Sequence, residues 1–171
     1  MYAKLVKLRY TWTAIAFAII FTLIGIWYTQ PTDIYGLDAK LEVESIAVTV
    51  TRSGDGENEV RSLDLTADSP AFGEVLEKLE RMTFNRPFKN LLYDSSILKR
   101  ELPPEDPLLP EGVFHIRVEL CGPADRMLTI MWDKDHWEYR KSSYDADLPL
   151  KAPKQTETPE SLNEYFWEIS E

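Results

Sequence analysis

Residues 11–28 read TWTAIAFAIIFTLIGIWY, and this uninterrupted apolar stretch decides how the rest of the chain is organised. In a helix that rises about 1.5 Å per residue, the stretch extends roughly 27 Å, which is just enough to cross the hydrocarbon core of a bilayer. Trp12 at one end and Trp27 and Tyr28 at the other match the aromatic belts of membrane proteins. We therefore predict a transmembrane anchor in residues 1–30, with the lipid bilayer as its partner through residues 11–28.

The charges that flank this stretch indicate its orientation. Lys4, Lys7 and Arg9 precede it without any acid, whereas two acids follow it before the next base, Lys40. Because basic residues favour the cytoplasmic side, we predict a single-pass protein of the cell membrane with a cytoplasmic N-terminus and its C-terminal domain outside. A cleaved signal peptide is the alternative. No small-x-small cleavage motif follows the stretch, so we expect an uncleaved signal-anchor.

Small residues gather on one face of the predicted helix. Thr11 is followed at spacings of 3, 4, 4 and 3 residues by Ala14, Ala18, Thr22 and Gly25. Such a face lets two helices approach closely, so Ala14, Ala18, Thr22 and Gly25 are candidates for helix–helix contact in the membrane. The alternative is that these residues belong to the ordinary composition of a membrane span.

The rest of the chain is strongly acidic. The net charge of the 171 residues is −10, and residues 1–30 carry +3, which leaves −13 for residues 31–171. A domain of this charge repels nucleic acid, and we exclude nucleic-acid partners on that ground. The acidity serves solubility, or it attracts cations or a basic partner. Cys121 is the single cysteine, so it packs at a strand end or pairs with a second copy of the chain.

We predict a polar stalk over residues 31–40 and an extracytoplasmic domain over residues 41–171. In the first half of the domain, alternating apolar residues predict two strands, 45–52 and 60–65, that a turn joins into a hairpin. A helix follows, because the next apolar residues have helical spacing: Phe72, Val75, Leu76, Leu79 and Met82. Four prolines predict a long loop over residues 93–112, which is either functional or only a surface connection.

The second half of the domain reads as strands followed by a helix. The clearest strand is 113–120; strands 126–132 and 137–141 continue it as an antiparallel meander, and a short strand lies around 147–150. Thr158 caps a final helix with an apolar stripe of Leu162, Tyr165, Phe166 and Ile169. The predicted fold class is α+β: an N-terminal transmembrane helix followed by an antiparallel sheet with two helices packed on one face.

The sequence contains no set of residues that is typical of catalysis. The two histidines, His115 and His136, lie on a polar strand face and in a tight turn. Asp133, Asp135 and His136 cluster like metal ligands, but aspartates also support turns by bonding their own backbone, and we favour that interpretation. We therefore predict no catalytic residue, no metal and no cofactor, and we favour a protein that is not an enzyme over the envelope enzyme considered below.

Aromatic residues share one face of the predicted second hairpin. A four-residue turn pairs Trp132 with Trp137 and Ile130 with Tyr139, so Trp132, Trp137 and Tyr139 point the same way. If that face is buried, they are core beneath a helix. If it is exposed, they form a binding platform that stacks on sugars or on a partner protein.

Parts of the chain resemble small uncharacterised membrane-anchored or lipoprotein-type extracytoplasmic domains of Gram-positive bacteria. The resemblance rests on IAVTVTR at 46–52, DSPAFGEVLEKL at 68–79, TFNRPF at 83–88, and a late meander that ends in a helix. It covers roughly residues 41–171 and departs from the pattern in the proline-rich segment 93–112. It implies an extracytoplasmic accessory domain and no particular activity.

Three functions remain open from the sequence. The first is a non-catalytic accessory or binding domain that acts on a membrane or cell-wall protein partner. The second is an envelope enzyme that acts on cell-wall polymers through carboxylates. The third is a transmembrane regulator that acts through its span.

Overall fold

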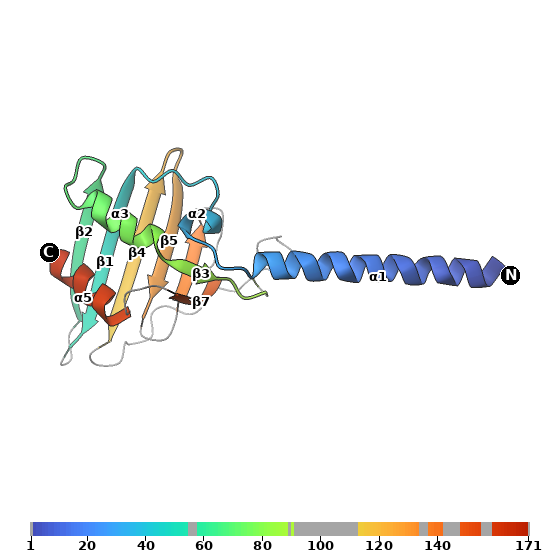
Figure 1. Ribbon diagram of the computed structural model, residues 1–171. Coiled ribbons are helices and arrows are strands. Elements are labelled where there is room, and N and C mark those ends of the chain that lie inside the picture. The colour runs from blue at the N-terminus through green and yellow to red at the C-terminus, as the bar shows by residue number, and fades with distance from the viewer. Residues whose placement is uncertain are drawn as a thin grey trace.

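In the computed structural model, which describes residues 2–54, 58–88, 90, 113–133, 137–141, 148–154 and 159–170, a long helix projects from one end of a domain built on a single sheet (Figure 1). The described helices are α1 (Tyr2–Tyr28), α2 (Ile34–Leu37), α3 (Phe72–Glu80) and α5 (Pro159–Ile169). The described strands are β1 (Ser45–Ser53), β2 (Asn58–Thr66), β3 (Thr83–Asn85), β4 (Phe114–Gly122), β5 (Arg126–Trp132), β6 (Trp137–Lys141) and β7 (Leu148–Lys154).

The strands form an antiparallel sheet in the order β2-β1-β4-β5-β6-β7-β3. The predicted first hairpin is confirmed as β1 and β2, which pair over nine residues each, and the predicted meander is confirmed as β4, β5 and β6. The strand expected around 147–150 is β7, which extends to Lys154. The loop expected over 93–112 and the cap expected at Thr158 lie outside the described residues.

The helices α3 and α5 lie on the same face of the sheet, as Figure 1 shows, so the predicted α+β fold with two helices on one face is confirmed. This face is apolar because every second residue of each central strand points toward it, as the pleat of a strand requires. The helices contribute Val75, Leu79, Leu162 and Phe166 to the same core. The central strands contribute Ile46, Val48, Val50, Ile116, Val118, Leu120, Leu128 and Ile130.

The opposite face of the sheet carries polar residues. Cross-strand neighbours there include Thr49 beside Arg117 and Ala47 beside Glu119, and the carboxylate of Glu119 pairs with Arg117. An antiparallel sheet commonly has one face on the core and one in water, and this sheet follows that pattern. The alternation of residue types along β1 and β4 in the sequence reflects it.

Residues 31–40, expected as a polar stalk, differ from that expectation in the structure. Thr32 forms a bridge with Phe84 of β3, and α2 follows at once. Ile34 and Leu37 are 0% and 1% exposed and belong to the hydrophobic core. Asp33 caps α2 by accepting a hydrogen bond from the backbone nitrogen of Gly36 at 2.8 Å. The segment is therefore part of the domain, and α1 leads into it directly.

Gly122 and Gly73 give a matched test of backbone packing. A Cβ on Gly122 would overlap the carbonyl oxygen of Glu42, which is backbone, whereas a Cβ on Gly73 would meet nothing within 4 Å. We expect Gly122→Ala to lower the free energy of unfolding by about 1–3 kcal/mol through overpacking. We expect Gly73→Ala, in the first turn of α3, to raise it by about 0.4–1 kcal/mol.

Thermal unfolding of the full chain in detergent, followed by circular dichroism, measures both changes. If Gly122→Ala unfolded with the same free energy as the wild type, this would contradict the close approach of Glu42 to the end of β4.

Candidate functional site

The aromatic residues that the sequence singles out lie inside the domain. Trp132, Trp137 and Tyr139 are 1%, 2% and 0% exposed. The predicted pairing is found, since Trp132 lies opposite Trp137 and their rings stack with centroids 4.8 Å apart and planes 4° from parallel. The indole nitrogen of Trp132 donates a hydrogen bond to Asn163 of α5 at 2.9 Å. These contacts match the core interpretation and leave no face of the stack for a ligand.

The other residues considered for chemistry are dispersed. His115 lies half-buried on the polar face of the sheet, Cys121 is a free thiol six residues further along the same strand, and Asp133 follows β5. Asp135 and His136 lie outside the described residues. Among the residues that the structure describes, no group of three metal-ligating side chains comes together.

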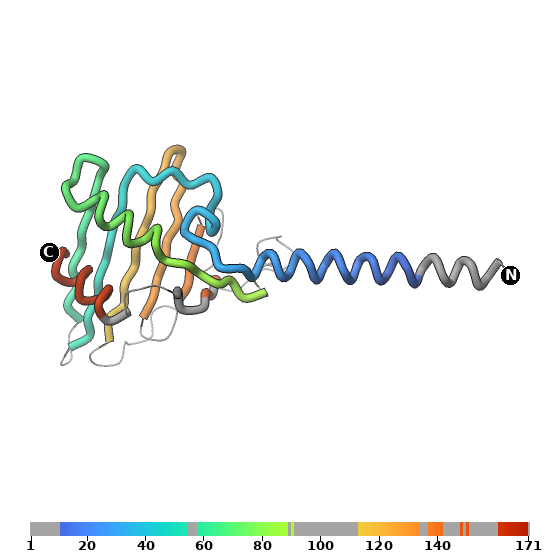
Figure 2. The backbone as a smooth tube through the Cα atoms, viewed as in Figure 1, coloured from blue at the N-terminus to red at the C-terminus, as the bar shows by residue number. Residues whose placement is uncertain are grey.

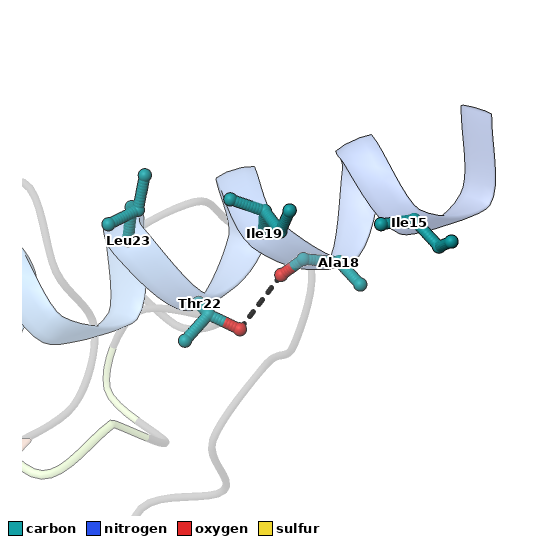
Figure 3. A pocket seen from close by; sticks show the side chains of 5 residues that line it. All are labelled: Ile15, Ala18, Ile19, Thr22 and Leu23. Atoms are coloured by element: carbon teal, nitrogen blue, oxygen red, sulfur yellow. Dashed lines mark hydrogen bonds between the residues drawn. The ribbon is translucent and has the colours of Figure 1, made fainter. Parts of the chain in front are cut away.

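The helix α1 is long and apolar enough to cross a membrane over Thr11–Tyr28, with a mean hydropathy of 1.8, and a signal sequence has the same properties. Its side chains in this stretch are almost all exposed. Ala18 and Thr22 line a shallow hollow of about 300 Å³ on its surface, together with Ile15, Ile19 and Leu23 (Figure 3). The hydroxyl of Thr22 donates to the carbonyl oxygen of Ala18 at 2.8 Å, so its polar group is satisfied within the helix.

The small face of α1 is divided by a contact with the domain. Ala14, Ala18 and Thr22 are exposed, but Gly25 is buried. A Cβ at Gly25 would lie 2.6 Å from the ring of Phe88, which follows β3. Gly25 therefore packs against Phe88 of the domain. Unless Phe88 moves, a second helix can contact only Ala14, Ala18 and Thr22 of the predicted face.

The end of α1 meets the domain at a contact that we call the junction, which we define as Tyr28, Thr32, Phe84, Arg86 and Phe88. Thr32 and Phe84 exchange two backbone hydrogen bonds, of 2.9 and 2.6 Å. Figure 2 shows the chain returning to the end of α1 after α3, which is what brings these residues together. Tyr28, the last residue of α1, is 3% exposed, whereas Trp27 is 67% exposed, so the domain covers one side of the helix end.

Arg86 connects three segments at the junction. Its guanidinium carbon lies 4.2 Å from the centroid of the Tyr28 ring, a cation–π distance. One of its terminal nitrogens donates to the carbonyl oxygen of Gly36 in α2 at 3.3 Å. The side chain thus links the end of α1 and α2 to the segment after β3. Sequence reasoning missed this role, although Arg86 and Phe88 belong to the conspicuous TFNRPF segment.

A second cluster of cations and aromatic rings, the Arg–Trp cluster, consists of Arg52, Arg61, Phe114 and Trp167. The guanidinium of Arg61 lies 3.9 Å from the centroid of the Trp167 ring, and Arg52 lies 5.4 Å from Phe114 and 5.7 Å from Trp167. The two rings meet edge to face at 5.8 Å. Continuing the alternation of β1 from Ile46 to Arg52 puts Arg52 on the helix-covered face, and this signal is present in the sequence.

Comparison with protein-family models, with curated proteins and with solved structures found no match. The resemblance to small extracytoplasmic domains of Gram-positive bacteria stays a prediction.

The phenol of Tyr35 gives the contact between α2 and α3 a measurable pH dependence. It donates to a carboxylate oxygen of Glu80 at 2.5 Å, which ties α2 to the end of α3. This bond, then burial, then the charges of Glu80 and Asp33 raise the pKa of Tyr35 from 10.0 to about 12. Because the unfolded phenol ionises first, the contribution of Tyr35 to stability is complete below pH 10 and is lost as the pH rises toward 12.

We expect the free energy of unfolding of wild type to exceed that of Tyr35→Phe at pH 9, and this difference to shrink by pH 11. Urea unfolding of both proteins at the two pH values measures it. A difference that is constant or grows with pH would show that Tyr35 does not hold its proton through Glu80.

Proposed function

We propose that this chain is a single-pass membrane protein whose domain acts outside the cytoplasm as a non-catalytic accessory or binding module. The observation that carries the proposal is the junction, since an exposed apolar helix leads without a spacer into a folded domain that encloses its last residue. The bases before the span and the acidic composition after it support the orientation. Such a joint suits a domain that must be held in one position relative to the membrane.

The strand order supports one arrangement of the domain relative to the proposed membrane span. Strand β3 lies beside the end of α1, and β2 is the opposite edge of the sheet (Figure 1). Six strand spacings of about 4.8 Å separate these edges by about 29 Å. The β3 edge of the sheet therefore lies nearest to α1. The Arg–Trp cluster lies at the end of the domain farthest from α1, on β1, β2, β4 and α5.

The Arg–Trp cluster is the contact surface that we favour for a partner. Tryptophan and arginine are the side chains most enriched among residues that dominate binding energy at interfaces. Arg61 pairs with Glu59 at 2.9 Å and packs on Trp167, whereas Arg52 is exposed beside both rings. In a segment with a charge of −13, the Arg52 guanidinium favours a protein or wall component that offers carboxylate or phosphate groups.

A transmembrane regulator is the second candidate, and the same junction favours it. Because Tyr28 and Gly25 of α1 contact Arg86 and Phe88 of the domain, a rotation or tilt of the helix moves the domain with it. The exposed residues Ala14, Ala18 and Thr22 are then the surface that a partner helix would use.

The test places a photo-crosslinking amino acid at Glu168, an exposed position next to Trp167, in intact cells. We expect one discrete crosslinked adduct. Protease added to intact protoplasts should digest the domain, because the proposal places it outside the cytoplasm. Arg52→Ala should reduce the adduct about tenfold, because removal of a central interface side chain costs at least ~1.4 kcal/mol.

Arg117→Ala is the matched control, since Arg117 is an exposed arginine on the polar face of the sheet and pairs with Glu119. It should leave the adduct unchanged. Equal losses from the two variants, or no adduct at all, would count against the Arg–Trp cluster as a binding surface.

A further inference from the structure

Phe88 reaches back along α1, past the point where the helix enters the domain. Its ring meets the ring of Phe21 edge to face, with centroids 5.6 Å apart, and lies against Gly25. Phe21 precedes the end of α1 at Tyr28 by seven residues, which is roughly 10 Å along a helix axis. A side chain of the domain therefore lies beside a part of α1 that belongs to its apolar stretch.

The depth of Phe88 follows from the position of the helix. If Trp27 and Tyr28 lie at the membrane surface, as aromatic residues at the ends of spans do, Phe21 and Gly25 lie within the adjoining leaflet. Phe88 contacts both of these residues and is 39% exposed. The exposed part of its ring then faces whatever surrounds α1 at that depth, and an apolar ring is favoured in lipid over water.

Arg86 lies on the water side of this position. Its guanidinium stacks on Tyr28 at the helix end and donates a hydrogen bond to the carbonyl oxygen of Gly36. With Tyr28 at the membrane surface, this guanidinium lies at the level of the lipid phosphates. A cation at the level of the head groups with an aromatic ring below it is the arrangement of segments that lie in a membrane interface. The sequence Arg86-Pro87-Phe88 thus runs from the head groups toward the acyl chains.

We propose that Arg86-Pro87-Phe88 is a second membrane contact, in which the Phe88 ring enters the leaflet on the domain side next to Gly25. The inference rests on the proposed membrane span of α1. The partner is the phospholipid surface itself, because the ring is positioned by the span that the lipid surrounds. With α1 as one contact and Phe88 as the other, the domain cannot tilt freely about the helix end.

The test uses the full chain with 4-fluorophenylalanine at position 88, which keeps the ring, reconstituted into phosphatidylcholine and phosphatidylglycerol bilayers. We expect the fluorine resonance of position 88 to be broadened by a lipid that carries a nitroxide near its head group and to be spared by a water-soluble gadolinium chelate. The same amino acid at Val60, which is 57% exposed on β2, should show the reverse. Equal responses at positions 88 and 60 would overturn the proposal.

A pair of variants tests the seat of the ring. Gly25→Leu should shift the fluorine resonance of position 88, because the new side chain occupies the space of the ring, and Ile24→Leu should leave it in place. Equal shifts would contradict the contact. Flotation of the chain with the bilayers distinguishes the proposed membrane span of α1 from the proposed Phe88 contact. A chain that does not float refutes the span. A chain that floats while the fluorine at position 88 is exposed to water refutes only the Phe88 contact.

Discussion

Three residues, Thr29 to Pro31, are all that separate the last residue of α1 from the backbone bridge between Thr32 and Phe84. Thr29 still bonds the carbonyl oxygen of Gly25 through both its amide, at 3.0 Å, and its hydroxyl, at 3.0 Å. The chain therefore has no free length with which the domain could turn independently of the helix. The side chain of Arg86 and the ring of Phe88 then fix the angle at which the two parts meet. The orientation of the domain relative to α1 depends on this joint.

The strand order sets the direction in which the sheet extends from the end of α1. Because β3 is the edge strand that receives Thr32, the other strands extend from it one after another, and β2 lies farthest from α1. The helices α2, α3 and α5 cover one face, and the Arg–Trp cluster lies on that face beside α5, at the end of the sheet farthest from α1. The stack of Trp132 and Trp137 fills the interior instead, where Asn163 satisfies the indole of Trp132.

Much of this fold follows from local patterns, and the rest depends on contacts between distant residues. The apolar run of α1, the alternation of β1 and β4, and the pairing of Trp132 with Trp137 are periodic and were predictable. The four residues of α2 are too few to show a helical repeat of apolar residues. The segment with Ile34 and Leu37 was therefore predicted to be a stalk. Whether Trp132 is buried depends on which face α5 covers, which no local pattern determines. Arg86 and Phe88 obtain their roles only when β3 returns to α1.

The distance between a spin label on α1 and one on the domain tests the central claim most directly. Labels at Phe17 of α1 and Gly73 of α3, in a chain with Cys121→Ser, sit at positions that are exposed or open. In bilayers we expect one distance distribution as narrow as that of a control pair within the domain, at Val60 and Gly73. A distribution much broader than the control would show that the helix and the domain move independently, which would contradict a rigid joint between them.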